Sequence, residues 1–307
     1  MPSAAAPRLP LPDESASPPE AGPRSDVQTS GWKASLALRF ARQGTATRAV
    51  ERRHHGPLRV QRMLYPEGPA CCHALLLHPP GGIAGGDRLD IAVALEEGAR
   101  ALLTTPGAAK WYRAAAAGAR QDVHLSVADG ACLEWLPQEA ILFDGARAAQ
   151  HATIALAPRA ATFGWDIVQL GRLAAGEAWR TGHWHQHFRV TRAGRPVWIE
   201  RARLAADDPL RASPLGLAGH PVFATAWAAS PALDADREAA LAAARAVAEA
   251  HDVPCGITWL AAPAELLVIR AVGEGAHAVR ALLEALWHTL RPWTASRAPQ
   301  RPRIWNT

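Results

Sequence analysis

The stretches HPPGGIAGGDRLDIAVALEEGARALLTTPGAAKWYRA, residues 78–114, and VHLSVADGACLEWLPQEAILFDGARA, residues 123–148, decide the fold. Short apolar runs in both are broken by Gly, Pro and charged residues. Apolar and polar residues alternate along 88–95 and along 123–127, so that every second side chain shares one face. This period of two is typical of β-strands with one buried face. The two stretches therefore predict strands joined by tight turns.

One phrase occurs in three versions, each with an apolar strand, a short turn and an alanine that opens a return strand. It reads VALEEGARALL around Gly98, LSVADGACLEWL around Gly130 and, less regularly, IALAPRAATFGW around Pro158. The copies lie about thirty residues apart, a spacing that predicts stacked two-strand units of a β-solenoid or layered sheet. Glycine at a corner can adopt the positive φ that a tight turn requires. Unrelated hairpins of a β-sandwich are the alternative.

Composition argues against several classes of protein. The chain has 307 residues, of which 49% are hydrophobic, and this is enough for a large core. No segment approaches the roughly 18 uninterrupted apolar residues of a membrane span. Four cysteines in a chain of this length do not resemble the dense disulfide framework of a small secreted domain, and they indicate a reducing cytoplasm.

The net charge of +5 does not predict a nucleic-acid-binding protein. Arginines are spread along the chain and interleaved with Asp and Glu, whereas a nucleic-acid surface needs clustered basic residues. We expect the positive charge to favour acidic protein partners.

The chain divides into a tail and one large domain. Residues 1–30 are rich in Pro, Ala and Ser and are predicted to be a disordered tail. Residues 31–307 form the domain, with a mainly β body over about 31–228, a helix-strand-helix cap over about 234–291 and a C-terminal tail at 292–307.

Two segments of the cap have helical periodicity. The Ala-rich segment 234–251 begins with Asp, and segment 276–291 places Val279, Leu283 and Leu290 along one side. A strand-like stretch, ITWLAAPAELLVIRA, lies between them. The sequence therefore predicts two helices near the C-terminus.

Further phrases extend to the end of the chain: GWDIVQLGRLAAGE at 164–177, WIERARL at 198–204, ASPLGLAGHPVFAT at 212–225 and RPRIW at 301–305. Together with residues 78–144 they resemble the urease accessory protein family UreD, also called UreH. The resemblance covers everything except roughly the first thirty residues. It implies a mostly β, helically stacked sheet with two helices, in agreement with the periodicity.

The resemblance also implies a non-enzymatic scaffold for urease maturation. It implies binding of the urease apoprotein and of UreF, which recruits the GTPase UreG, in a complex that delivers nickel to the urease active site. We therefore expect these partners, no tightly bound cofactor, and Ni²⁺ as a transient cargo. Arg303 and Trp305 are expected to form part of the UreF-facing surface, because exposed aromatic and Arg side chains favour interface anchoring.

Carboxylates in the family phrases are the candidates for handling this cargo. A cation that moves between proteins needs ligands that exchange, and isolated carboxylates hold it more weakly than a closed thiolate cage. We expect an internal polar passage lined by Asp87, Glu139, Asp144 and Glu177. The alternative for each is a solvated or salt-bridged surface residue.

A β-helical carbohydrate-active enzyme is the alternative function. Two carboxylates facing each other across a sugar groove would support it, and Glu134 and Glu200 are further acidic residues in the same phrases. Most of the twelve tryptophans stand singly in strand contexts, where core packing is their expected role. No G-x-S-x-G or H-E-x-x-H motif is present.

The segment HWHQH places His183, His185 and His187 at a period of two. On a strand all three imidazoles project from one face, as in sheet-borne metal sites that take Ni²⁺ or Zn²⁺. The triple histidine is not a signature of the resembled family, so a surface strand or an adventitious metal site is the alternative.

A second cluster joins Cys71, Cys72 and His73, with His78 five residues further on. On a strand, Cys72 and His78 share one face while Cys71 and His73 share the other, so no more than two of them can easily reach one ion. The interpretation we favour is a buried strand with small side chains, because free Cys is among the most buried residue types.

Overall fold

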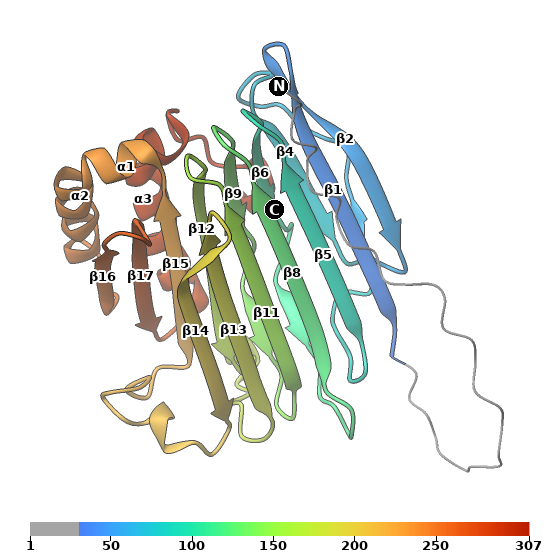
Figure 1. Cartoon of the computed structure of the whole chain (residues 1–307). Coiled ribbons are helices and arrows are strands. Elements are labelled where there is room, and N and C mark those ends of the chain that lie inside the picture. The colour runs from blue at the N-terminus through green and yellow to red at the C-terminus, as the bar shows by residue number, and fades with distance from the viewer. Residues whose placement is uncertain (1–30, 307) are drawn as a thin grey trace.

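The computed structural model describes residues 31–306 as a mainly β structure with stacked coils, and this confirms the predicted fold class. Two sheets lie face to face, and the helices cover the outer face of the second sheet (Figure 1). The predicted tail at 1–30 lies outside the described residues.

The first sheet has seven strands, and its central part is parallel. Antiparallel strands close both of its edges, since β2 pairs with β1 and β14 pairs with β13. In spatial order the strands are β14 (Arg195–Ala205), β13 (His183–Arg192), β11 (Arg147–Leu156), β8 (Ala119–Val127), β5 (Arg88–Leu95), β1 (Lys33–Gln43) and β2 (Ala46–His55).

The second sheet has ten strands, of which β4, β6, β9 and β12 are parallel neighbours. Two short strands, β7 (Ala109–Trp111) and β10 (Ala140–Leu142), pair beside its main path. That path runs through β16 (Cys255–Leu260), β17 (Leu266–Gly273), β15 (Val222–Ala229), β12 (Ala161–Leu170), β9 (Cys132–Leu136), β6 (Arg100–Thr104), β4 (Cys72–Leu77) and β3 (Arg59–Val60).

The three versions of the repeated phrase are the corners at which the chain passes from the first sheet to the second. β5 leads to β6 through Gly98, β8 leads to β9 through Gly130, and β11 leads to β12 through Pro158. Both glycines have a positive φ, 69° and 67°. The corners stack directly, because Gly98 N donates to Asp129 O at 3.2 Å and Gly130 N donates to Arg159 O at 3.2 Å. The predicted solenoid coils are confirmed.

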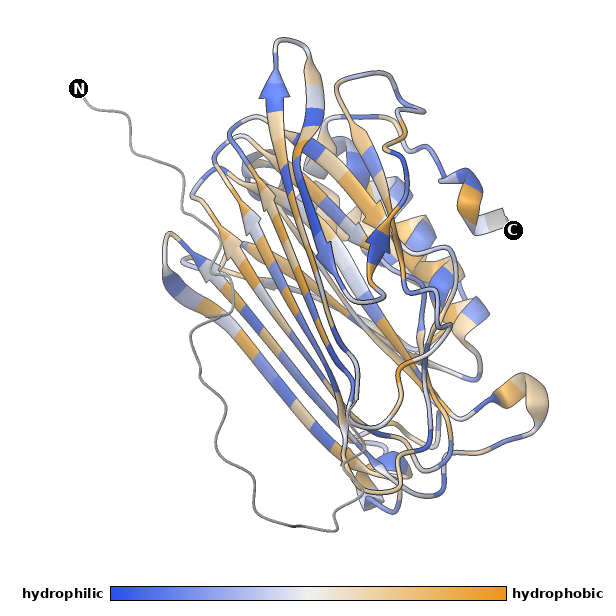
Figure 2. Ribbon diagram, turned by 90° about the vertical axis from the view of Figure 1, so that its right-hand side faces the viewer, coloured by the Kyte–Doolittle hydropathy of each residue, from blue (hydrophilic) through white to orange (hydrophobic). Residues whose placement is uncertain are grey.

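The alternation of side chains along the strands builds two cores. Inward residues of both sheets, such as Val93 and Ile154 of the first and Leu133 of the second, are fully buried between the sheets. Figure 2 shows this alternation as bands of hydrophobic and hydrophilic residues along the strands. A second core, which includes Phe163 and Leu283, lies between the ten-stranded sheet and the helices.

The predicted cap is more closely joined to the β body than the sequence indicated. Its strand-like segment forms a hairpin, β16 and β17, and β17 pairs with β15, so both strands extend the ten-stranded sheet. The two predicted helices are present as α2 (Arg237–Glu249) and α3 (Ala276–Ala295), and a short helix, α1 (Pro231–Ala235), precedes them. Ser230 begins α1, since its Oγ accepts a hydrogen bond from Leu233 N at 2.9 Å.

Three short 3₁₀ turns complete the structure: η1 (Leu173–Ala175), η2 (Pro209–Arg211) and η3 (Arg303–Asn306). None of the described helices is both long and apolar enough to cross a membrane.

Gly182 lies where two stacked coils are in close contact. Its φ is 107°, and a side chain there would overlap the carbonyl oxygen of Ala146 in the preceding coil. We expect Gly182→Ala to lower the free energy of unfolding by about 2 kcal/mol, from backbone strain and displacement of that coil. Gly194→Ala is the control, because φ is 78° there but no atom lies within 4 Å of the added Cβ. Its expected loss is about 1 kcal/mol. Urea denaturation measures both variants, and equal losses would contradict the stacking argument.

Candidate functional site

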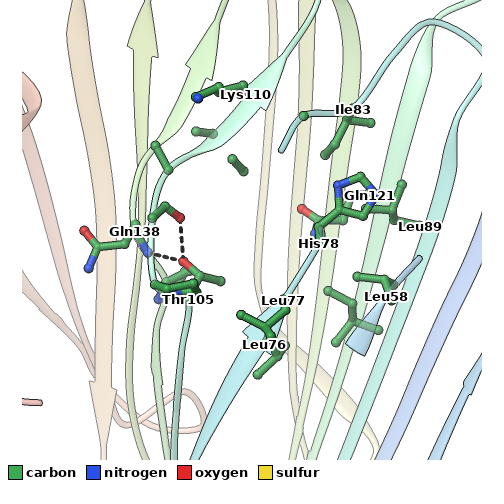
Figure 3. A pocket seen from close by; sticks show the side chains of 18 of the residues that line it. Leu58, Leu76, Leu77, His78, Ile83, Leu89, Thr105, Lys110, Gln121 and Gln138 are labelled. Carbon is green, nitrogen blue, oxygen red and sulfur yellow. Dashed lines mark hydrogen bonds between the residues drawn. The ribbon is translucent and has the colours of Figure 1, made fainter. Parts of the chain in front are cut away.

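A cavity of about 310 Å³ lies between the two sheets. Six water molecules occupy roughly 180 Å³ in the liquid, so the cavity has room for a hydrated metal ion. Figure 3 shows His78 and Gln121 facing Thr105 and Gln138 across it, with leucines below. Lys110 also lines the cavity, but it is exposed and therefore belongs to the rim.

His78 lines this cavity and has an unused ring nitrogen. Its Nε2 is buried and has no hydrogen-bond partner among the residues that the structure describes. Burial lowers the pKa of His78, and the nearby Asp87 opposes this shift only in part. A neutral imidazole with an unused nitrogen can bind a metal ion or a water molecule.

Asp166 is the carboxylate that lines the cavity. Its side chain is buried and accepts hydrogen bonds from Gln150 Nε2 at 3.0 Å and from Gln186 Nε2. Burial raises its pKa to about 6, against the effect of both hydrogen bonds and with a further contribution from Glu200. No Lys, Arg or His within residues 31–306 forms an ion pair with it. A buried carboxylate without a counter-ion is a candidate for binding a cation.

A row of polar residues leads from the cavity to solvent, and we call it the interior polar row: Gln121, Gln150, Asp166, Gln186 and Glu200. The three glutamines occupy paired positions on β8, β11 and β13. Asp166 lies on the opposite sheet and accepts from Gln150 and Gln186. Its partner on β15, Thr225, donates to Glu200 Oε1 at 3.4 Å.

The outer end of the interior polar row is an ion pair between Glu200 and Arg270, whose side chain is 60% exposed. The row therefore connects the cavity with the solvent beside the edge strand β14. All of its members offer oxygen atoms, and carboxylate and amide oxygens bind divalent cations in an exchangeable way.

The family model described as UreD urease accessory protein matches residues 33–306 of this chain. The chain belongs to the UreD family. It is 48% identical to the urease accessory protein UreD of Pseudomonas fluorescens strain Pf0-1, over 91% of this chain and 96% of the relative. It is 46% identical to UreD of Dechloromonas aromatica, over 90% and 95%, and 45% identical to UreD of Nitrosococcus oceani, over 97% of both chains.

Membership of the UreD family gives this chain a role in urease maturation. The relatives are named as accessory proteins, so the chain is an accessory protein and not an enzyme. The alternative of a carbohydrate-active enzyme has no support among them.

Two of the carboxylates singled out in the UreD phrases lie together. Asp144 Oδ1 accepts hydrogen bonds from the backbone of Arg180 and Thr181, each at 2.8 Å, and Glu177 Oε1 accepts from Asp144 N at 3.1 Å. The pKa of Asp144 is lowered, first by the Arg180 backbone, and that of Glu177 is lowered, first by Arg172. Both carboxylates hold the turns that follow β10 and β12, and neither is among the residues that line the cavity.

The other two candidates are separate from this pair. Asp87 is buried and accepts hydrogen bonds from Trp32 N and Ala84 N, each at 2.8 Å, so it holds the turn before β5. Glu139 pairs with Arg280 of α3 at 3.4 Å. Neither residue lines the cavity. That the four carboxylates handle nickel stays a prediction.

Asp166 itself lies within the quoted phrase GWDIVQLGRLAAGE, but sequence reasoning passed over it. An aspartate in the middle of an otherwise apolar run, FGWDIV, is the signal that could have found it. Its glutamine partners carry no such signal, since only the strand register brings them together.

The cysteine-histidine cluster forms a buried ion network. Donor atoms of Glu67, Cys71 and His73 lie within 4.8 Å of one another, the only such group of three or more Asp, Glu, His and Cys residues in the described part of the chain. Glu67, however, already accepts from His73 Nε2 at 2.6 Å and from Arg291 Nη2 at 2.7 Å. Arg291 also holds Glu134, so the cluster fastens α3 to the β body. His78 lies apart from it, in the cavity.

Trp305 corrects the expectation of an exposed C-terminal anchor. The side chain is buried, its Nε1 donates to Thr104 Oγ1 at 2.8 Å, and its ring lies against Trp165 and Trp287 with centroids 5.7 and 5.9 Å apart. The RPRIW phrase thus contributes a core residue, because an indole gains more from burial beside other rings than from exposure. Arg303 is exposed, and its part in partner binding stays a prediction.

The three histidines of HWHQH lie on β13 and project from the outer face of the seven-stranded sheet, as their spacing predicted. They do not converge on one point. His183 lies against His185, with ring centroids 4.9 Å apart, whereas His187 lies against His151 of β11, with centroids 5.7 Å apart.

Proposed function

We propose that this chain is a scaffold that binds UreF and the urease apoprotein, recruits UreG through UreF, and gives Ni²⁺ a protected route to urease along the interior polar row. The observation that supports this best is Asp166, a buried carboxylate without a counter-ion at the wall of a cavity that could hold a hydrated ion. A transient cation would supply the missing positive charge.

The donor set suits a cargo more than a resident metal. His78 offers one imidazole, Asp166 one carboxylate, and the glutamines offer neutral oxygens, without a thiolate. Such a set binds nickel less firmly than a closed cage of thiolates, so that the ion can leave. All four cysteines are unpaired, in keeping with the cytoplasm as the place of action.

The test is urease activation in cells that lack their own copy of this protein but express UreF, UreG and urease. We expect the wild-type chain to co-purify with UreF and to restore the nickel content and activity of urease. Asp166→Asn should still bind UreF but should lower nickel incorporation about tenfold, the usual scale for losing one metal-handling group. Asp129→Asn is the matched control, because Asp129 lies in a solvated corner and accepts from Arg159 N at 2.8 Å.

The outcomes separate the two parts of the proposal. Failure of the wild-type chain to bind UreF would contradict the scaffold. Full nickel incorporation with Asp166→Asn would contradict the interior route alone. Glu177→Gln completes the comparison, since a loss with this variant and not with Asp166→Asn would place the route along the carboxylates that the sequence singled out.

A further inference from the structure

The outer face of β13 carries a pair of imidazoles that no part of the proposed function uses. His183 and His185 lie two positions apart on the strand, and Trp184 between them is fully buried against Trp111, with ring centroids 5.5 Å apart. Because Trp184 fixes which face of the strand is inward, both histidines must project outward. Their rings are tilted by only 30°, with centroids 4.9 Å apart.

Both imidazoles are available for a ligand. Neither makes a hydrogen bond or an ion pair with any residue that the structure describes. His183 is half-buried and His185 is exposed, so a metal ion can reach both rings from solvent. The neutral form of an imidazole is the one that ligates metals.

The neighbouring strands leave room at this pair. Each ring has an alanine as its neighbour on one side, since His183 pairs with Ala205 of β14 and His185 pairs with Ala149 of β11. The cross-strand neighbours on the other side are cations: Arg147 of β11 pairs with His183, and Arg203 of β14 pairs with His185. Both arginines are exposed, and solvent and salt screen their repulsion of a bound ion.

We propose that His183 and His185 form a two-imidazole chelate for a divalent late transition-metal ion on the outer face of the seven-stranded sheet. Two neutral imidazoles on one strand select borderline ions, and the remaining coordination positions are filled by water. The affinity then follows Cu²⁺ above Ni²⁺ above Co²⁺, with Mn²⁺ weakest. This site does not depend on the interior polar row, which lies on the other face of the sheet.

The pair of His151 and His187 is the nearest competitor and is less suited to a metal. His151 Nδ1 lies 3.5 Å from Asp122 Oδ1, and Arg120 holds both oxygens of that carboxylate at 2.6 and 2.7 Å. The rings of this pair are almost perpendicular, at 83°. A cation there would lie next to the Arg120 guanidinium, whereas the pair of His183 and His185 has no such bound cation.

The experiment is a titration of the purified, untagged full chain with Ni²⁺ in competition with a chromophoric chelator, repeated with Cu²⁺. We expect His183→Ala/His185→Ala to lose one bound equivalent of Ni²⁺ and to lose the two-nitrogen signature in the Cu²⁺ electron paramagnetic resonance spectrum. His151→Ala/His187→Ala should retain both. His124→Ala is the matched control, because His124 projects from the same face of the sheet but has Ala92 and Thr153 as its neighbours.

Two results would overturn the site. One is a double variant at 183 and 185 that binds Ni²⁺ like the wild type, and the other is loss of the equivalent in the variant at 151 and 187 alone. Urease activation is a separate readout, so a result on this site does not decide the proposed function.

Discussion

Replacing Arg291 with methionine is expected to lower the free energy of unfolding by about 3–5 kcal/mol. Arg291 is completely buried, and its Nε and Nη2 donate to Glu134 at 2.9 Å while Nη2 also donates to Glu67 at 2.7 Å. Removing the guanidinium leaves the buried Glu134 without a cation and leaves Glu67 with only His73 and the more distant Arg297. Such a loss is far more costly than losing a surface pair. Urea denaturation monitored by tryptophan fluorescence measures the effect.

Arg280→Met is the control for this prediction. Arg280 lies on the same helix and pairs with Glu139 and Glu284 at 3.4 and 3.6 Å, but its side chain is 20% exposed. We expect a loss of about 1 kcal/mol or less. If the two variants lose equal stability, the buried network does not fasten α3 as we infer.

The same network has a defined pH dependence. Burial raises the pKa of Glu67, but hydrogen bonds from His73 and Arg291 outweigh it and lower the pKa to about 2. Because the native carboxylate releases its proton at lower pH than the unfolded one, its stabilising contribution is present above about pH 4.5 and is lost as the pH falls towards 2.

Replacing Asp166 with asparagine is expected to increase stability at pH 7.5, by up to about 3 kcal/mol, because its pKa lies about two units above the ordinary 3.8. Burying the charged form is unfavourable, and asparagine keeps the shape and the hydrogen bonds to Gln150 and Gln186 once their amides reorient. Urea denaturation of both proteins at several pH values measures the gain.

The sign of the Asp166 effect follows from proton binding. The native carboxyl keeps its proton up to about pH 6, whereas an unfolded aspartate loses it near 3.8. Between these values the native state binds more protons, so the contribution of Asp166 to the free energy of unfolding falls as the pH rises. Asp166→Asn should lack this fall in the free energy of unfolding. Asp129→Asn should keep it, and a variant at 166 that is less stable at pH 7.5 would contradict the account.

The two predictions have opposite signs because Arg291 neutralises buried carboxylates, whereas Asp166 is a buried carboxylate without an ion-pair partner among the described residues. Arg291 completes a network in which every buried charge has a partner, and the network stabilises the fold. Asp166 has no cation among the described residues, and we infer that its stability penalty is retained for cation handling. A gain in stability together with a loss of nickel incorporation in Asp166→Asn would link the stability penalty of this carboxylate to cation handling.

Local patterns were enough to predict the elements. The period-two runs at 88–95 and 123–127 are strands β5 and β8, and the phrases around Gly98 and Gly130 are stacked corners. Segment 234–251 contains α2, and α3 begins at Ala276 as predicted but continues to Ala295, into the predicted C-terminal tail. The single strand expected between the helices is a hairpin that joins the main sheet, a difference that pairing with β15 decides.

The amino-acid sequence alone determined the strand periodicity, the solenoid corners and the resemblance to the UreD family, because these depend on neighbouring residues or on whole phrases. Only the tertiary structure decided the sites. Gln150 and Gln186 meet Asp166, and Gln121 lies beside Gln150, because strand register aligns positions that are distant in the chain. In the same way, packing of the C-terminal segment made Trp305 a core residue. Contacts of this kind depend on pairing between distant segments, which no local pattern records.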